Sequence, residues 1–152
     1  MLSKFFLAAG TGNGNTSLTS FDAALIQAGI GDYNLVKVSS ILPRNAVSME
    51  TIEIDKGQLL HVAYASITSK EEDAIISAAV AIGIPKDRSH TGVIMEYSGR
   101  CSRKEAEVTV VSMVDEAMDL RHEVIGSIKV ISSSCKTVSD KFSTAIAAVA
   151  LL

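Results

Sequence analysis

Apolar residues recur along the chain at two spacings, which separate the expected helices from the expected strands. A first helix is expected before the stop signal GIGD, and Thr16 or Ser17 can cap its start. Its apolar positions at helical spacing are Leu18, Phe21, Leu25 and Ala28. The segment SKEEDAIISAAVAIGIP predicts a second helix, because acidic residues in the first turn oppose the helix dipole and glycine and proline stand at its end. Residues 102–120 predict a third, opened by SRKE at capping-box spacing.

Runs of β-prone residues predict seven strands between and after these helices. Residues 59–67 alternate most clearly, with Leu60, Val62 and Tyr64 on one face. Strands are expected over residues 4–9, 35–42, 47–54, 59–67, 92–98, 127–132 and 142–152. After the first strand, GTGNGNTS is expected to be a flexible loop, because glycine and asparagine accept left-handed backbone. The order of elements predicts one domain of α/β layers with a mixed or largely antiparallel sheet.

Composition and charge narrow the classes of function. The chain has 152 residues, 47% of them hydrophobic, and a mean hydropathy of +0.30, so some apolar surface is expected to contact another subunit. A net charge of −3 without any basic run argues against nucleic acid as a partner. No apolar run is long enough to span a bilayer. Cys101 and Cys135 are isolated, which indicates reduced thiols in a cytoplasm and disfavours a zinc site.

The glycine-rich stretch and the histidines offer two functions that the sequence supports weakly. GTGNGN stands between a strand and a helix, as in dinucleotide-binding proteins, but Asn15 occupies the place of the third glycine and no P-loop ending follows. Ser40 lies in no GxSxG elbow, and His61, His90 and His122 cannot be paired with it from the sequence. A nucleotide-binding protein using Gly10–Gly14, or a non-catalytic oligomeric domain, stays open as an alternative.

The pair Ser39–Ser40 ends the apolar run NLVKVSSILP and permits a different chemistry. A hydroxyl can attack the carbonyl just upstream of it when the backbone is strained and the oxyanion is stabilised, which exchanges the amide for an ester. Elimination from that ester splits the chain and leaves dehydroalanine, which hydrolyses to a pyruvoyl group. Two strand-end serines can also simply satisfy backbone groups, and SSS at 132–134 is a second serine run.

What surrounds the two serines carries a resemblance to a known family. The stretch LTSFDAALIQAGIGDYNLVKVSSILP resembles, nearly end to end, the N-terminal signature of the pyruvoyl-dependent arginine decarboxylases, and GVIMEYSG resembles their later active-site segment. The resemblance implies a layered αββα sandwich of the α+β type. It also implies cleavage into residues 1–39, the β chain, and residues 40–152, the α chain, which begins with a covalent pyruvoyl group derived from Ser40.

The same resemblance implies an activity and a set of site residues. Arginine would form a Schiff base with the pyruvoyl group and lose carbon dioxide to give agmatine, without a metal, in a homotrimer with sites at subunit interfaces. Asn34 matches the residue that assists self-processing, Asp22 the carboxylate that receives the guanidinium, and Glu96 the proton donor. Leu18 and Gly31 match positions that line the substrate.

Two of these roles have support from the residues themselves. Asp22 lies four residues after Leu18 and three before Leu25, so it is expected on the apolar stripe, where a carboxylate calls for a cation such as a guanidinium. It can equally stand in the first turns to favour the helix dipole. Glu96 lies within VIMEY, where apolar neighbours disfavour its charged form and favour a proton donor. A solvent-facing strand position is the other interpretation.

Overall fold

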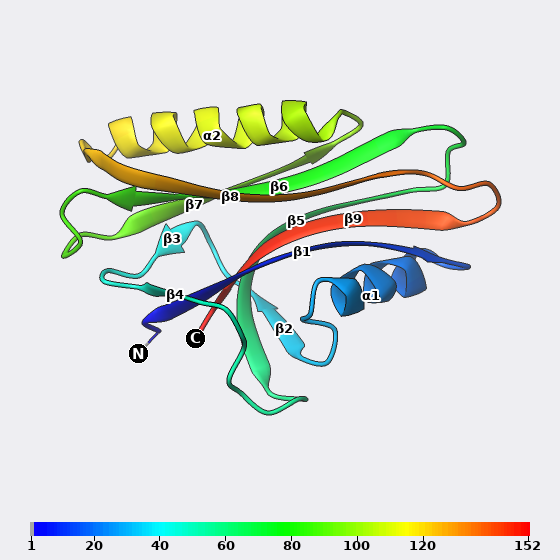
Figure 1. Ribbon diagram of the computed structural model, residues 1–152, viewed down its shortest axis with the longest axis horizontal. Helices are drawn as coiled ribbons and strands as arrows, with labels where there is room; N and C mark the ends of the chain where they lie inside the picture. Colours follow the sequence, from blue (N-terminus) through cyan, green and yellow to red (C-terminus); the bar gives the residue numbers. More distant parts are fainter. Residues whose placement is uncertain (1) are drawn as a thin grey trace.

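The computed structural model describes residues 2–152, which form four layers (Figure 1). Helix α1 (Ser17–Gln27) covers the outer face of a five-stranded sheet, and helix α2 (Arg103–Asp119) covers the outer face of a four-stranded sheet. The two sheets pack face to face between the helices. The fold is therefore the predicted αββα sandwich of the α+β type.

The five-stranded sheet is mixed and has the order β2-β5-β9-β1-β4. Its long strands pair antiparallel, β1 with β9 and β9 with β5, whereas the short strands β2 and β4 pair parallel with β5 and β1. The strands are β1 (Lys4–Gly14), β2 (Asn34–Lys37), β4 (Val47–Met49), β5 (Leu59–Ser69) and β9 (Phe142–Leu151).

The four-stranded sheet is antiparallel throughout and has the order β3-β7-β6-β8. Its strands are β3 (Ile41–Leu42), β6 (Ile75–Pro85), β7 (Gly92–Gly99) and β8 (Ile125–Lys136). Helix α2 lies across β6, β7 and β8 (Figure 1). Neither α1 nor α2, the helices of residues 2–152, is long and apolar enough to cross a membrane.

The segment expected to be the second helix is β6, so that prediction is wrong. Its side chains alternate between two cores: Ile76, Val80 and Ile82 face the other sheet, whereas Ala79 and Ala81 pack under α2. Because both faces are buried, the strand is a continuous apolar run in which neither spacing stands out. The small alanines, which favour a helix in isolation, here let α2 approach the sheet closely.

The glycine-rich stretch is also not the flexible loop that was expected, because β1 continues to Gly14. Gly10, Gly12 and Gly14 all face α1, and a Cβ at any of them would clash with the helix backbone; at Gly10 it would lie 2.5 Å from the Ala24 carbonyl oxygen. The alternate glycines therefore let α1 lie directly on β1. The loop on which the nucleotide-binding alternative rested is absent from the described chain.

The other predicted elements are largely confirmed, with changed boundaries. Thr16 caps α1, where its hydroxyl accepts a hydrogen bond from the Thr19 amide at 3.1 Å, and Ser102 and Glu105 form the predicted capping box of α2. The strand expected over residues 47–54 is confined to β4. The strand expected over residues 35–42 is broken into β2 and β3, and this break contains the serine pair.

Candidate functional site

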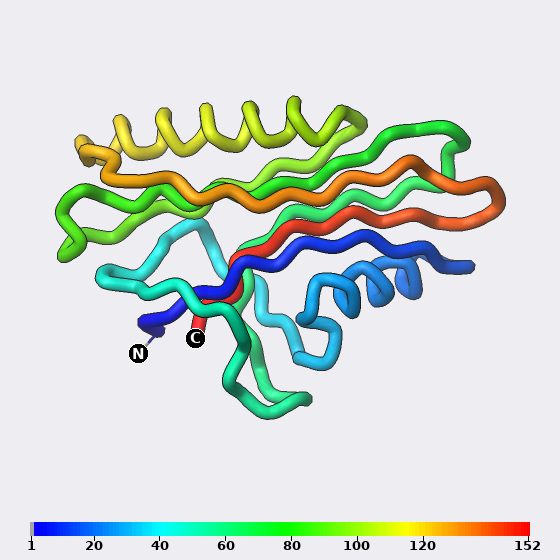
Figure 2. The backbone as a smooth tube through the Cα atoms, in the orientation of Figure 1, coloured from blue at the N-terminus to red at the C-terminus, as the bar shows by residue number. Residues whose placement is uncertain are grey.

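The chain moves from one sheet to the other at Ser39–Ser40. The Val38 amide donates to the Val62 carbonyl at 3.0 Å, which continues the pairing of β2 with β5. The Ile94 amide donates to the Ser40 carbonyl at 2.8 Å, which leads into the pairing of β3 with β7. Figure 2 follows this step, where the cyan tube rises from the layer of α1 toward the four-stranded sheet. The peptide bond between the serines thus spans two anchored ends, and within residues 2–152 neither hydroxyl has a hydrogen-bond partner.

Glu96 lies on β7, two residues beyond the strand position that holds Ser40. Its Oε1 atom is 3.4 Å from the Lys37 ammonium nitrogen. Its Oε2 atom is buried and has no hydrogen-bond partner in the described chain. A buried polar atom without a partner is costly and rare, and a catalytic role is one of the reasons for which a fold keeps one. The side chain as a whole is 32% exposed, so Glu96 is neither fully buried nor freely solvated.

Lys37 is a member of this cluster that the sequence did not reveal. Its ammonium lies over the Tyr64 ring, 4.6 Å from the ring centroid, and the Tyr64 ring in turn packs against Phe21 of α1 at 6.1 Å between centroids. The contacts therefore run from α1 through β5 and β2 to Glu96 on β7. A charged residue inside the apolar run NLVKV was the available signal, but a lysine on an edge strand is ordinarily a solvent-facing residue.

Asp22 lies on the exposed face of α1, so the expectation that it shares the buried stripe is wrong for the single chain. Its neighbours one turn away, Leu18 and Ile26, are 75% and 63% exposed. The Asp22 side chain takes part in none of the hydrogen bonds or ion pairs of residues 2–152. The carboxylate therefore stands between two exposed apolar side chains, an arrangement that leaves it open to a ligand or another subunit.

Gly31 and Asn34 lie on the segment between α1 and β2. A Cβ at Gly31 would meet the Ile26 backbone, so glycine is needed for close contact with the end of α1. Gly31 and Ile26 line a hollow of about 240 Å³. The Asn34 side-chain amide donates to the Gly57 carbonyl at 2.7 Å and so contacts the turn before β5, not the serine pair.

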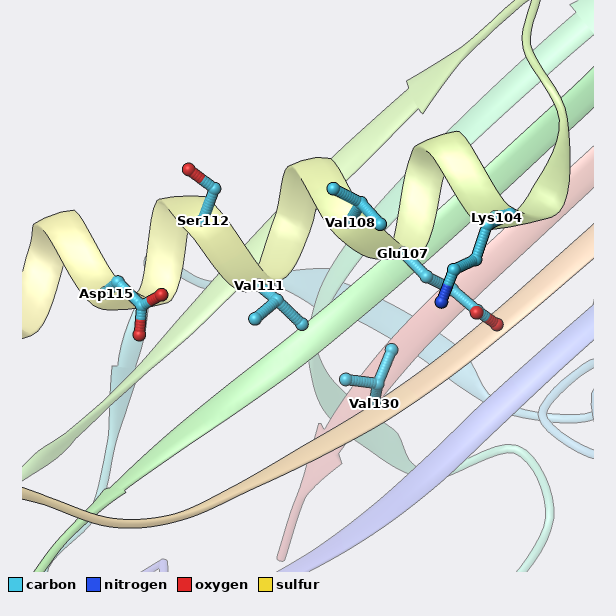
Figure 3. A pocket seen from close by; sticks show the side chains of 7 residues that line it. All are labelled: Lys104, Glu107, Val108, Val111, Ser112, Asp115 and Val130. Atoms are coloured by element: carbon cyan, nitrogen blue, oxygen red, sulfur yellow. The ribbon is translucent and has the colours of Figure 1, made fainter.

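A surface groove of about 500 Å³ that α2 helps to line contains none of the predicted site residues. It lies between α2 and β8, where Val111 and Val130 stand on opposite sides (Figure 3). One lysine and two carboxylates complete its lining beside Val108 and Ser112. It lacks an activated nucleophile, and its size alone does not identify it as the reactive site.

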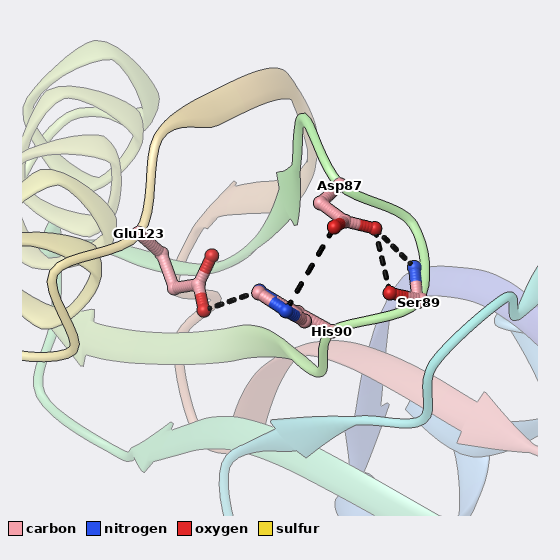
Figure 4. Close-up of polar contacts among 4 residues, drawn as sticks. All are labelled: Asp87, Ser89, His90 and Glu123. Carbon is pink, nitrogen blue, oxygen red and sulfur yellow. Dashed lines mark hydrogen bonds and ion pairs between the residues drawn. The ribbon is translucent and has the colours of Figure 1, made fainter.

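A histidine cluster lies on the loop between β6 and β7 (Figure 4). His90 Nδ1 is 2.8 Å from a Glu123 carboxylate oxygen and its Nε2 is 3.8 Å from Asp87, which accepts hydrogen bonds from the Ser89 amide and hydroxyl. The hydrogen bond and charge of Glu123, helped by Asp87, raise the pKa of His90 above its usual 6.5. The cluster joins this loop to the connection between α2 and β8 and does not include the serine pair.

Comparison with known proteins identifies the family. The family model described as pyruvoyl-dependent arginine decarboxylase matches residues 4–152. The chain belongs to the pyruvoyl-dependent arginine decarboxylase family. It is 44% identical over 149 residues to the pyruvoyl-dependent arginine decarboxylase of Thermococcus kodakarensis, covering 97% of this chain and 94% of that protein. It is 41% identical over 145 residues to that of Methanocaldococcus jannaschii, covering 95% and 87%.

The residues of this chain fit the pyruvoyl group that the family name implies. Such a group requires a serine whose upstream peptide bond can be broken, and Ser40 follows a bond held between two sheets with its hydroxyl free of partners among the described residues. Glu96, whose Oε2 atom is buried without a partner in the described chain, lies two residues along β7 from the Ile94 amide that holds Ser40. Both observations come from the geometry and agree with the family assignment.

Proposed function

We propose that the chain cleaves itself between Ser39 and Ser40 and then converts L-arginine to agmatine and carbon dioxide. The observation that carries the proposal is the serine pair at the crossing between the sheets, with the partnerless Glu96 oxygen beside it. The relatives are named as arginine decarboxylases, which supports arginine as the substrate. The nucleotide-binding alternative loses its support, because Gly10–Gly14 belongs to β1.

The residues themselves account for self-cleavage. The Ser40 hydroxyl attacks the Ser39 carbonyl carbon, the C–N bond breaks and an ester joins the two residues. Loss of the Ser40 α-proton then expels the Ser39 carboxylate and leaves dehydroalanine at the start of the new chain. Water hydrolyses the dehydroalanine to the pyruvoyl ketone, and its nitrogen leaves as ammonia. Asn34 is proposed to assist; its hold on Gly57 fixes the start of β2, whose other end leads into the serine pair.

In the decarboxylation, the pyruvoyl ketone supplies the electrophile that accepts the electron pair when carbon dioxide leaves. Asp22 receives the guanidinium, since two parallel hydrogen bonds to a carboxylate suit that planar group. Leu18 and Gly31 line the path beside it. Glu96 delivers a proton to the carbon that has lost the carboxylate, and its Oε2 atom is free to do so.

We further propose that the active form is a homotrimer in which a neighbour completes each site. Both lateral edges of the sandwich are partly open. On one side β2 covers β5 only from Leu59 to Val62, and β3 covers β7 only at Gly92 and Val93. On the other side β8 has a single neighbour, β6. Two different open edges favour a head-to-tail contact, which closes into a ring. Leu18 and Ile26 supply exposed apolar surface beside Asp22. The cytoplasmic location rests on the two free cysteines and stays a proposal.

The direct test is incubation of the purified protein with arginine, followed by measurement of agmatine and carbon dioxide. Lysine and ornithine serve as comparison substrates, because their ammonium groups cannot form the forked contact with Asp22. Glu96→Gln should retain cleavage and lose most turnover. Equal turnover of the three amino acids would overturn the assignment of arginine, and full turnover by Glu96→Gln would remove Glu96 from proton transfer.

A further inference from the structure

Lys37 closes a ring of contacts around the bond between the serines. The main chain runs from Lys37 to Ser40, whose carbonyl accepts the Ile94 amide at 2.8 Å. Glu96 lies two residues further along β7 than Ile94. Its Oε1 atom is 3.4 Å from the Lys37 ammonium nitrogen, and this contact completes the ring. The ion pair and the serine link therefore cross the same gap between the sheets, since Lys37 belongs to one sheet and Glu96 to the other.

The two carboxylate oxygens of Glu96 have different surroundings. Oε1 faces the Lys37 ammonium, whereas Oε2 is buried without a partner in the described part of the chain. The ammonium is itself held in place by the Tyr64 ring beneath it, and Phe21 packs against that ring. A cation over an aromatic face has a preferred position, so Lys37 is not a freely moving surface side chain although it is 55% exposed.

We propose that Lys37 is a positioning residue for Glu96: by holding Oε1 it keeps Oε2 directed at the carbon that receives the proton. The inference rests on the proposed function of Glu96. After cleavage the positioning of Glu96 depends more on Lys37, because the covalent link between Ser39 and Ser40 is gone. The Lys37–Glu96 pair then remains as a contact between the end of the β chain and strand β7 of the α chain.

The place of protonation gives a readout that a merely structural role would not change. A proton on the substrate carbon yields agmatine. A proton on the carbon that came from Ser40 instead leaves the substrate nitrogen on the chain, which then begins with alanine, and water releases the substrate carbon skeleton as an aldehyde. The ketone is reduced to the amine while the substrate carbon is oxidised, so this outcome needs no external oxidant.

The experiment compares Lys37→Met with Lys37→Arg in the full-length protein. Both variants should cleave, because the hydrogen bonds of Val38 and Ser40 do not involve the side chain. Lys37→Met should lose about 100-fold in kcat with KM within about twofold, the loss typical of a slightly misplaced catalytic group. After turnover with arginine its α chain should acquire an alanine terminus, read by N-terminal sequencing and intact mass. Lys37→Arg should recover most of kcat, and the N-terminus of its α chain should stay blocked to sequencing.

Lys4→Met is the matched control, because Lys4 and Glu53 form a pair of nearly the same length, 3.3 Å, at a site away from the serines. It should behave as the wild type. Wild-type kcat in Lys37→Met, or a fall in kcat without any alanine terminus, would overturn the role of Lys37 while leaving the proposed function intact. Failure of the wild-type chain to cleave would instead overturn the proposed function.

Discussion

At the scale of single residues, Asp22 carries the specificity for arginine in our proposal. Replacing it with asparagine removes the charge but keeps the size, so cleavage at Ser39–Ser40 should proceed normally. A hydrogen-bonded charge contributes roughly 1.5–3 kcal/mol, so KM for arginine should rise about 10- to 100-fold. Steady-state kinetics measure this rise in KM. The control is Glu53→Gln, which removes the carboxylate of the exposed Lys4–Glu53 ion pair. An unchanged KM would remove Asp22 from substrate recognition.

The candidate residues could be named from the sequence, but their contacts could not. The motif around Ser39–Ser40 and the strand around Glu96 contain the reactive groups, and the resemblance assigned their roles. Lys37 was missed because its contact with Glu96 joins residues far apart in the chain and on different sheets. The expectation for Asp22 is wrong because it rests on the spacing from Leu18 and Leu25, and Leu18 is itself 75% exposed.

At the scale of elements, the close contact of β1 with α1 holds the helix that carries Asp22. Gly12→Ala should destabilise the protein by about 1–3 kcal/mol, because the new Cβ meets the backbone of Ala23 and Ala24, which cannot move away like a flexible side chain. Urea unfolding monitored by circular dichroism measures the shift. Lys4→Met, an exposed position on the same strand, should stay within about 0.5 kcal/mol of the wild type. Equal stability of Gly12→Ala would contradict the packing described.

The His90 cluster predicts a pH-dependent contribution to stability. Glu123 raises the pKa of His90 when the protein is folded, so the stabilisation is fully present below 6.5, the unfolded value, while the carboxylates are ionised. It is lost as the pH rises through the folded pKa. The difference in unfolding free energy between the wild type and His90→Asn should therefore be larger at about pH 5.5 than at about pH 9. A difference that grows with pH would contradict this account.

Helix α2 was predicted close to its observed bounds, because it has a capping box, one buried face and one exposed face. The spacing failed where both faces are buried, as in β6, and where small residues serve close packing, as at the glycines of β1. In these places tertiary contacts override the local preference.

At the scale of the whole molecule, the position of the reactive bond depends on two sheets at once. The layers could be predicted, but the crossing at Ser39–Ser40 could not, because it depends on β2 pairing with β5 and β3 pairing with β7. Both pairings are short and join distant segments of the chain. The sequence from Leu35 to Leu42 therefore predicts one continuous strand, although the chain changes sheets within it.

The proposed trimer predicts that two variants, each with little activity at arginine concentrations below the wild-type KM, restore each other. In Asp22→Asn the serine is intact, and in Ser40→Ala the carboxylate is intact, so a site built from neighbouring copies can take one good residue from each. Equal co-expression should restore about one quarter of wild-type activity, since about one interface in four then joins the two intact residues. The separately purified variants are the controls. No recovery in mixed trimers would place both residues of a site on one chain.

The breaking of the Ser39–Ser40 bond is tested most directly by intact mass under denaturing conditions. The wild-type protein should give two chains divided between these residues, with the larger one blocked to N-terminal sequencing and reactive with hydroxylamine. Ser40→Ala should give one uncut chain that releases no carbon dioxide from arginine. A wild-type chain that stays in one piece and still decarboxylates arginine would contradict the account.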